Sequence, residues 1–373
     1  MKSLAYLLFL VEAVVCTIYY VESAPTAPYL CTQSQPCRLQ DLPTTFSTSD
    51  SVIFVPATTG SSSTFSSATK TLVKPSVTVS AGLTFSAFTL NVAGASTLTC
   101  TGTTNFQSGS TLATANVVTI SVDGCNFDNS QLVGQGANTI TFKNAAVSGM
   151  SSSKKIQLQG TTVIVDTVTF SSGSTSVPAL YLLPSSTGSQ FGLNSISMTD
   201  VTTTGSTPLV LMQSISNRDF SATVQSPTFT RCVSGGALVE MRISYAGSPP
   251  TFNCDGDMES FTVVNGSVAQ GLFYFNNGHN TATMSAIVAV LAATGVNYGN
   301  GSPFLINANP GIVGVNGWQQ NSNAICGGSN EANIITCTGT QANGNMLLNG
   351  DTDGPTSVSG CGSTTLVNMG TNC

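Results

Sequence analysis

Short apolar stretches separated by polar turns recur along most of this chain. The stretch Ser226–Met241 is one complete unit of the pattern. It contains a short apolar strand around Phe229, a polar turn that closes on Gly235-Gly236, and a second strand that runs from Ala237 to Met241. Alternation of apolar and polar residues over such short runs is typical of strands with one buried side.

Similar units precede and follow this stretch. Their apolar anchors recur at a nearly regular interval, at Phe142, Phe170, Met198, Phe229, Phe261 and Leu291. The second strand recurs as Val177–Leu182, Thr207–Met212, Gly236–Met241, Gly271–Phe275 and Pro303–Asn307. A fixed period of this size indicates a solenoid, in which each repeat buries its apolar side against its neighbours.

The interval is shorter between residues 71 and 147, where Val122 and Phe142 occupy comparable positions of successive units. Helical signals are almost absent along the whole chain, and no capping pattern precedes an apolar run. A β-sandwich explains strands every 8–12 residues, but it gives no reason for the longer period. A parallel β-helix explains both, since each turn of the helix holds about three short strands. We therefore predict an all-β chain that forms a single-stranded parallel β-helix.

The pattern also predicts the domain boundaries. Residues 71–315 carry the repeats and should form the β-helix. Residues 24–70 are rich in serine and threonine and are expected to form an N-terminal cap, and residues 316–373 a C-terminal cap that contains cysteines. A solenoid needs caps because its end turns otherwise expose unpaired backbone groups.

Residues 1–23 have the pattern of a secretory leader. Lys2 supplies a positive charge, Leu4–Val15 is an apolar run, and Val21 and Ser23 fit the small-residue cleavage pattern, so Ala24 is the expected first mature residue. A membrane anchor is the alternative, but the apolar run is too short for it, and no later stretch is long enough to span a bilayer. We therefore expect an extracellular or cell-surface protein without a membrane span.

The cysteine content fits the same compartment. Loss of the leader removes Cys16 and leaves ten cysteines, an even number that indicates disulfides. Zinc is the competing use, but there is no C-x-x-C motif and the chain has one histidine. The cysteines are expected to pair locally, as Cys31–Cys37, Cys100–Cys125, Cys232–Cys254, Cys326–Cys337 and Cys361–Cys373. The two central pairs are about one turn apart in sequence and should lie on neighbouring turns.

Composition narrows the possible partners. Charged residues make up 7% of the chain, against about 25% in an ordinary soluble domain, and the net charge is −6. No basic region is concentrated enough to hold nucleic acid. The apolar fraction of 41% is spread over short strands, which argues against disorder. Nothing in the sequence predicts a metal or a cofactor.

One repeat resembles a known family. The segment Phe229-Thr-Arg-Cys-Val-Ser-Gly-Gly-Ala-Leu-Val is similar to the repeat of polymorphic membrane proteins of the chlamydial type, in which Phe-x-x-Asn precedes Gly-Gly-Ala. Cys232 stands where that family has asparagine. The resemblance implies a right-handed parallel β-helix of the pectin-lyase-like superfamily, and it implies adhesion at a cell surface by analogy alone.

The segment Asp255-Gly-Asp-Met-Glu259 is the best local candidate for chemistry. If it is extended, Asp255, Asp257 and Glu259 point to one side of a strand, where they could share acid and base roles or bind calcium. The favoured interpretation of the segment, however, is a solvated polar turn between two strands. Two sequons, at Asn265 and Asn300, are candidate N-glycosylation sites, each in a turn between two strands of a unit.

These features favour a secreted structural or adhesive protein, a rigid rod that contacts extracellular glycan or matrix protein. The alternative is a carbohydrate-active or glycan-binding β-helix, with Asp255, Asp257 and Glu259 as the first residues to test. The two expected caps predict a monomeric rod. End-to-end self-association is the alternative, because the ends of a β-helix carry backbone groups ready to pair with another strand.

Overall fold

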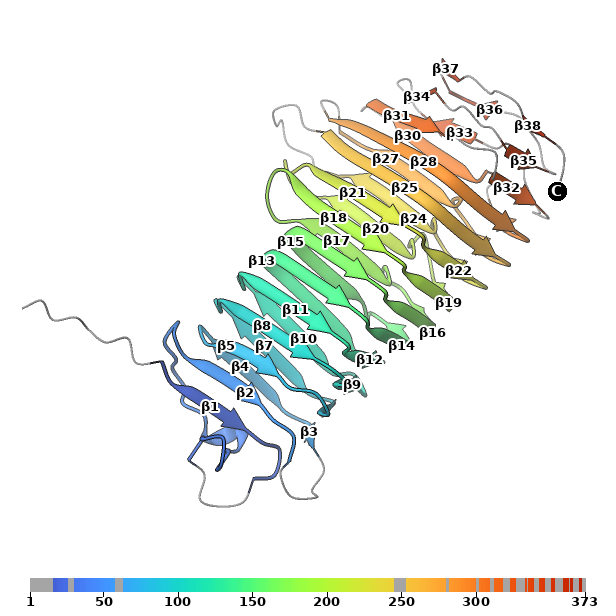
Figure 1. Ribbon diagram of the computed structural model, residues 1–373. Coiled ribbons are helices and arrows are strands. Elements are labelled where there is room, and N and C mark those ends of the chain that lie inside the picture. Colours follow the sequence, from blue (N-terminus) through green and yellow to red (C-terminus); the bar gives the residue numbers. More distant parts are fainter. Residues whose placement is uncertain are drawn as a thin grey trace, which may run out of the picture.

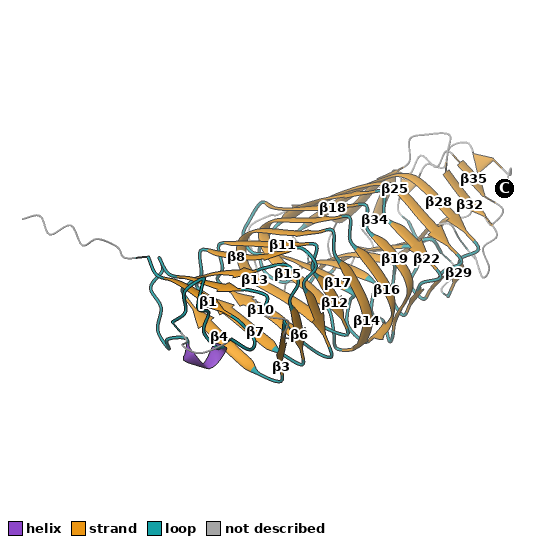
Figure 2. Ribbon diagram, turned by 60° about the horizontal axis from the view of Figure 1, so that its bottom comes forward, coloured by secondary structure: helices purple, strands orange, loops and turns teal. Residues whose placement is uncertain are grey.

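The protein is a long rod built by the stacking of short parallel strands (Figure 1). The computed structural model describes residues 16–25, 30–57, 63–244, 253–279, 282–299, 302–308, 312–317, 323–326, 333, 335–338, 342–345, 350–352, 358–361, 363–364 and 369–370. The N-terminal strand and the C-terminal strands lie at opposite ends of the rod. Figure 2 shows the strands stacked along the rod, with short turns joining them.

Each turn of the helix, here called a rung, contributes strands to three faces. Face A comprises β1 (Ile18–Val21), β2 (Ser51–Phe54), β5 (Ser76–Val79), β8 (Thr97–Thr101), β11 (Thr119–Asp123), the second halves of β13 (Gln131–Lys143) and β15 (Ile156–Asp166), β18 (Ser189–Asn194), β21 (Phe220–Gln225), the first halves of β25 (Asn253–Val264) and β28 (Thr283–Thr294), β31 (Ile312–Gly317), β34 (Ala342–Asn345) and β37 (Ser363–Thr364).

Face B comprises β3 (Thr64–Ser66), β6 (Thr84–Ser86), β9 (Asn105–Gln107), β12 (Asn126–Asp128), β14 (Ala146–Ser152), β16 (Thr169–Thr175), β19 (Ser197–Thr203), β22 (Thr228–Thr230), β23 (Val233–Ser234), the second halves of β25 and β28, β26 (Ser267–Val268), β29 (Asn297–Tyr298), β32 (Asn323–Cys326), β35 (Gly350–Thr352) and β38 (Met369–Gly370).

Face C comprises β4 (Thr69–Val73), β7 (Thr89–Ala93), β10 (Thr111–Ala115), the first halves of β13 and β15, β17 (Leu180–Pro184), β20 (Val210–Ser214), β24 (Val239–Ile243), β27 (Phe273–Asn277), β30 (Phe304–Ala308), β33 (Ile335–Thr338) and β36 (Val358–Ser359). Strands of successive rungs pair in parallel on every face, which confirms the predicted all-β parallel β-helix. A β-sandwich would have antiparallel sheets.

The length of a rung changes along the rod. Ile120 pairs with Ile140 in the region of short rungs. Further along, Val163 pairs with Phe191, and beyond that Phe220 pairs with Cys254. The rung length therefore increases from Ile120 through Val163 to Phe220. The sequence predicted this change from short to long rungs, and the additional residues lie between strands that stay in register.

The corner between faces A and B has the same backbone conformation in successive rungs. One residue there has a positive φ, between 47° and 76°, and donates its N–H to a carbonyl of the next rung. The residues are Gly102, Gly124, Asn144, Thr167, Ser195 and Ser226. Glycine and asparagine adopt this left-handed conformation at low cost, which is one reason why small and polar residues separate the strands.

The Gly-Gly pair of the best-defined repeat is explained by close backbone packing. A Cβ atom on Gly235 would lie 2.0 Å from the carbonyl oxygen of Gly205, and one on Gly236 would lie 2.8 Å from the nitrogen of Pro208. Both positions therefore require glycine, because the neighbouring rung leaves no space for a side chain.

The core is a continuous column of apolar side chains inside the rungs. Along face B, Phe65, Phe85, Phe106 and Phe127 stack in order, with ring centroids 5.2, 4.9 and 4.9 Å apart. Each ring has its neighbours in the adjacent rungs, and Phe85, Phe106 and Phe127 are fully buried. The core is therefore formed between rungs, as expected for a solenoid.

The predicted repeat register is correct on one face and partly wrong on another. The recurring second strand is face C, where Leu180, Val210, Val239, Phe273 and Phe304 align in register. Phe170, Met198 and Phe229 align on face B.

Three of the predicted anchors are out of register: Phe142, Phe261 and Leu291, the last of which pairs with Phe261. Phe142 lies on face A, and Val147 is the residue that pairs with Phe170. Val263 pairs with Phe229, two positions after the predicted Phe261. Phe142 and Phe261 were equated with Phe170 and Phe229 because both are large apolar residues at about the right interval. The true partners are the smaller Val147 and Val263.

Strand pairing extends beyond the predicted boundaries of the β-helix. At the C-terminal end, parallel pairing continues from β31 through β38, so residues 316–373 contain further rungs and 315 is not the end of the helix. At the N-terminal end, β2 and β3 lie inside the segment expected to be a cap, residues 24–70. The same segment holds a loop with the short 3-10 helix η1 (Leu39–Asp41).

Two of the expected disulfides are present, and the expected pairing of the others is corrected. Cys31 bonds to Cys37 and Cys100 bonds to Cys125, as predicted. Cys337 bonds to Cys361, which replaces both predicted C-terminal pairs. The side chain of Cys326 and the residue Cys373 lie outside the described part of the chain.

The predicted Cys232–Cys254 bond is wrong. Both thiols are free and buried. Cys254 is on face A, where it pairs with Phe220, whereas Cys232 lies between β22 and β23 on face B. The interval from Cys232 to Cys254 was interpreted as one rung, but a rung here is longer, since it runs from Val233 to Ser267.

The phenylalanine column gives a first prediction. Phe106→Ala should lower the free energy of unfolding by about 3–5 kcal/mol, because it leaves a cavity between two stacked rings. Val118→Ala, at a side chain that is 49% exposed, is the control and should change it by under about 1 kcal/mol. Urea denaturation followed by circular dichroism measures both. Equal changes in the free energy of unfolding would show that the phenylalanine column contributes no more to stability than an exposed side chain.

The disulfide pattern gives a second prediction. Non-reducing peptide mapping should recover the linked pairs Cys100–Cys125 and Cys337–Cys361. Cys232 and Cys254 should react with iodoacetamide only after denaturation, because both are buried and burial raises the pKa of each thiol, that of Cys254 to about 12. A peptide that links Cys232 to Cys254 would contradict the rung register described above.

Candidate functional site

The acidic segment is a strand, which was one of its two expected structures. Residues Asp255, Asp257 and Glu259 are in β25, where Cys254, Gly256 and Met258 between them are buried. The three carboxylates therefore share the outer side of face A. This excludes the polar turn.

The surroundings of these carboxylates are small and polar. Asp255 lies between Ser221 and Ser285 of the adjacent rungs, and the Ser285 hydroxyl donates a hydrogen bond to it. Asp257 lies between Thr223 and Ile287. Within the part of the chain that the structure describes, no group of three His, Cys, Asp or Glu side chains could hold a metal ion.

The most distinctive group of polar side chains lies on the outer side of face C. We call it the face C patch and define it as Tyr181, Gln213, Glu240, Arg242, Tyr274, Asn276 and Asn307. Strands β17, β20, β24, β27 and β30 contribute these residues in two columns. One column contains Tyr181, Glu240 and Tyr274, and the other contains Gln213, Arg242, Asn276 and Asn307.

Hydrogen bonds join the patch across the rungs. The Tyr181 hydroxyl donates to Oε1 of Gln213 over 2.6 Å, and Nε2 of Gln213 donates to the Ser244 hydroxyl over 2.6 Å. Further along, Nδ2 of Asn307 donates to Oδ1 of Asn276 over 3.0 Å. Side chains at one position of successive rungs are about 4.8 Å apart, which is why short polar side chains reach one another.

An ion pair occupies the centre of the patch. Nε and Nη2 of Arg242 donate to the two carboxylate oxygens of Glu240 over 2.6 and 2.7 Å, and Nδ2 of Asn276 donates to Oε1 of Glu240 over 3.4 Å. The Glu240 side chain is 0% exposed although it points away from the core, and the Arg242 side chain is 29% exposed. Both oxygens of the carboxylate are therefore engaged.

Burial controls the charge states of the patch. It raises the pKa of Glu240, and the hydrogen bond and charge of Arg242 offset this only in part. Burial also raises the pKa values of Tyr181 and Tyr274, so both keep their hydroxyl protons at neutral pH. Nζ of Lys155 lies 5.8 Å from the centre of the Tyr181 ring.

A polar groove adjoins the patch at the corner between faces C and A. Its volume is about 540 Å³, and its lining includes Asn116, Gln135, Gln159, Ser186 and Arg218. Strand β15 supplies Gln159 to the groove, and Gln159 pairs with Leu183 on β17, the strand that carries Tyr181. The groove and the patch together form a surface of hydroxyl, amide and guanidinium groups with little net charge.

The candidate glycosylation sites are only partly described. Asn265 is exposed in the turn between β25 and β26, which is the predicted position. Asn300 lies outside the described residues. Attachment of a glycan to either residue stays a prediction.

Reasoning from the sequence missed the face C patch. Tyr181, Glu240 and Tyr274 lie in the strands that define the repeat, and their apolar neighbours made the whole strands look buried. An alignment of these strands to one another contains the missing signal. Tyr181, Glu240 and Tyr274 fall at one position of the repeat, and residues at one position of a strand share a side.

Comparison with family models, with curated proteins and with solved structures finds no match to this chain. The resemblance of one repeat to polymorphic membrane proteins thus has no family model to support it, and the fold stands on the strand pairing described above. In the described part of the chain, no helix has the length and apolar character needed to cross a membrane.

The buried carboxyl of Glu240 gives a third prediction. Its pKa is raised in the folded protein, so the folded state holds this proton more tightly than the unfolded state. Its contribution to the free energy of unfolding is fully present below the unfolded pKa of about 4.3 and is lost as the pH rises through the folded pKa.

Urea denaturation of the wild type and of Glu240→Gln from pH 4 to pH 8 measures this contribution. The stability of the wild type relative to the variant should fall as the pH rises. Val118→Ala, which changes an exposed and non-titratable side chain, is the control and should show no such trend. A relative stability that increases with pH would show that Arg242 dominates and lowers the pKa of Glu240.

Proposed function

We propose that this protein is an extracellular structural or adhesive rod that binds neutral glycans through the face C patch. The observation that carries the proposal is the patch itself, in which tyrosines and side-chain amides form a ladder along the rod. Sugars suit such a surface because their C–H faces pack on aromatic rings and their hydroxyls exchange hydrogen bonds with amides.

The stack of rungs supports a mechanical or adhesive role. A repeat structure presents long, regular surfaces, and solenoids use such surfaces for binding. Charged residues make up only 7% of the chain, so attraction of a charged partner over a distance contributes little. Binding of a neutral glycan should accordingly depend weakly on salt.

The geometry favours binding over turnover. Glycoside hydrolysis needs a pair of carboxyl groups about 5–9.5 Å apart across the bond to be cleaved. Glu240 is the acidic member of the patch, and Arg242 engages both of its oxygens. The carboxylates of β25 are on a different face, among Ser221, Thr223 and Ser285.

Secretion and end-to-end association belong to the same proposal. The disulfides Cys31–Cys37, Cys100–Cys125 and Cys337–Cys361 suit an oxidising compartment. Parallel strand pairing continues to β38. A strand edge that no further rung covers could pair with a strand of another copy. An extracellular rod with glycans at Asn265 and Asn300 would be held in a matrix by these contacts.

A glycan-binding assay tests the proposal and is the fourth prediction. The purified protein should bind a subset of neutral glycans on an array, and the double substitution Tyr274→Ala with Asn276→Ala should weaken binding about tenfold or more. The matched control is Asp255→Asn with Asp257→Asn on face A, which should leave binding unchanged. Loss of binding in the control alone would contradict the proposal and favour the acidic segment as the site.

A further inference from the structure

The first strand of the rod lies inside the segment that the sequence assigned to the secretory leader. Strand β1 pairs with β2 over its whole length, from Ile18 opposite Ser51 to Val21 opposite Phe54. Val21 is 0% exposed, and the ring of Tyr19 contacts that of Phe46 edge-on with centroids 5.5 Å apart. This is the packing of a permanent part of the fold.

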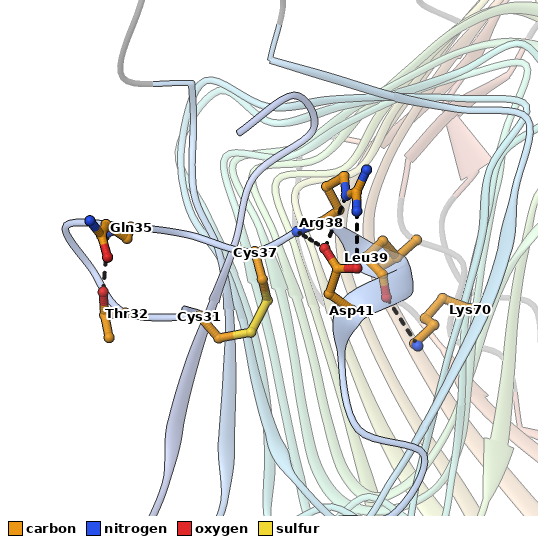
Figure 3. Close-up of a disulfide and its surroundings, with 8 residues drawn as sticks. All are labelled: Cys31, Thr32, Gln35, Cys37, Arg38, Leu39, Asp41 and Lys70. Carbon is orange, nitrogen blue, oxygen red and sulfur yellow. Dashed lines mark hydrogen bonds and ion pairs between the residues drawn. A yellow bond between two sulfur atoms is a disulfide. The ribbon is translucent and has the colours of Figure 1, made fainter. Parts of the chain in front are cut away.

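The disulfide loop at this end also depends on β1. The Tyr20 N–H donates to the carbonyl of Cys31, and the Cys37 N–H donates to the carbonyl of Tyr20, each over 2.9 Å. The Glu22 N–H donates to the carbonyl of Cys37 over 3.0 Å. Figure 3 shows the loop that these bonds hold against the end of the rod. Cleavage after Ser23 would remove all of these partners and leave β2 unpaired on one edge.

A carboxylate is placed where β1 begins. Asp50 is only 7% exposed, and its Oδ2 accepts the Ser47 N–H over 2.7 Å. Its Oδ1 accepts the backbone N–H of Thr17 over 3.2 Å. The backbone nitrogen of Thr17 is therefore held against a nearly buried negative charge, although Thr17 itself and Cys16 before it are exposed.

The sequence has a second cleavage pattern at this position. The apolar run Leu4–Val15 ends directly before Cys16, with Val14 and Cys16 at the two positions where leader peptidases require small residues. Removal of residues 1–16 takes away Cys16 and leaves ten cysteines, as removal of residues 1–23 does. An even number of cysteines therefore remains after cleavage at either site, so their number does not distinguish the two sites.

We propose that the leader is removed between Cys16 and Thr17, and that the new α-ammonium group of Thr17 binds the Asp50 carboxylate. Water hydrolyses the Cys16–Thr17 peptide bond, so that Cys16 leaves with a carboxylate and Thr17 keeps an amine, which takes up a proton. The hydrogen bond that exists between a neutral N–H and Asp50 then becomes charge-assisted, and such bonds are stronger. Processing thereby completes the first rung instead of destroying it.

The site rests on the secretion proposed above, and N-terminal sequencing with intact mass of the protein from the medium of a secreting host tests it. A chain that starts at Thr17 is the expected result. A secreted chain that starts at Ala24 overturns the cleavage site and leaves secretion intact. A chain that stays in the cells with Met1 retained overturns both.

Two substitutions separate the two cleavage sites within the same expression system. Cys16→Leu places a large residue at the cleavage position and should abolish removal of the leader, while Ser23→Leu should leave the product starting at Thr17. The opposite pattern, with Ser23→Leu blocked and Cys16→Leu processed normally, overturns the proposal.

Thermal denaturation tests the proposed ion pair between the Thr17 ammonium group and Asp50. Asp50→Asn should lower the melting temperature of the chain that starts at Thr17. A Gly-Ser extension before Thr17 moves the ammonium group away, and it should lower the melting temperature as well. In the extended chain, Asp50→Asn should have a smaller effect. An equal effect of Asp50→Asn in both chains would show that Asp50 acts only through backbone N–H groups.

Discussion

Everything in this molecule depends on each rung lying in register on the next. Parallel backbone pairing repeats on all three faces, and the inward side chains of one rung are covered on both sides by those of the adjacent rungs. The phenylalanine column, the left-handed corner residues and the disulfide between Cys100 and Cys125 all follow from this register. A rung that slipped by one residue would turn its apolar side chains outward.

The same register organises the outer surface. Residues at one position of successive rungs form a column in which neighbours are about 4.8 Å apart. Polar side chains in such a column can therefore hydrogen-bond along the rod. On face C this arrangement includes a carboxylate with no exposure, Glu240, whose cost of burial Arg242 and Asn276 offset in part. Polar side chains also bond across rungs elsewhere, as Asn126 does with Asn105 and Arg231 with Asp200. The buried carboxylate and the tyrosines beside it distinguish the face C patch, and this is why we propose it as the binding surface.

The sequence predicted the architecture because the period of the apolar strands is set directly by the length of a rung. It predicted the register of face C correctly, since each rung from Leu180 to Phe304 has a recognisable apolar strand at this position. It failed where the rung length changes. The interval from Cys100 to Val122 is one full rung, but the equal interval from Cys232 to Cys254 ends before the rung is complete.

The two candidate sites differed in how far the sequence revealed them. The acidic strand was the less favoured of two interpretations, because the sequence favoured a polar turn at Asp255, Gly256 and Asp257. The face C patch was not anticipated, because which side of a strand faces outward depends on partners far away in sequence.

The position of the cysteines has a consequence for how the rod bears load. Between Cys125 and Cys326 the sequence contains two cysteines, Cys232 and Cys254, and both thiols are free. If a pull on the ends detached rungs one at a time, each long rung that opened would release about 100 Å of chain. The Cys100–Cys125 and Cys337–Cys361 crosslinks limit this extension near the two ends. Such a pull would therefore extend the rungs between Cys125 and Cys337 further than the rungs that these disulfides join.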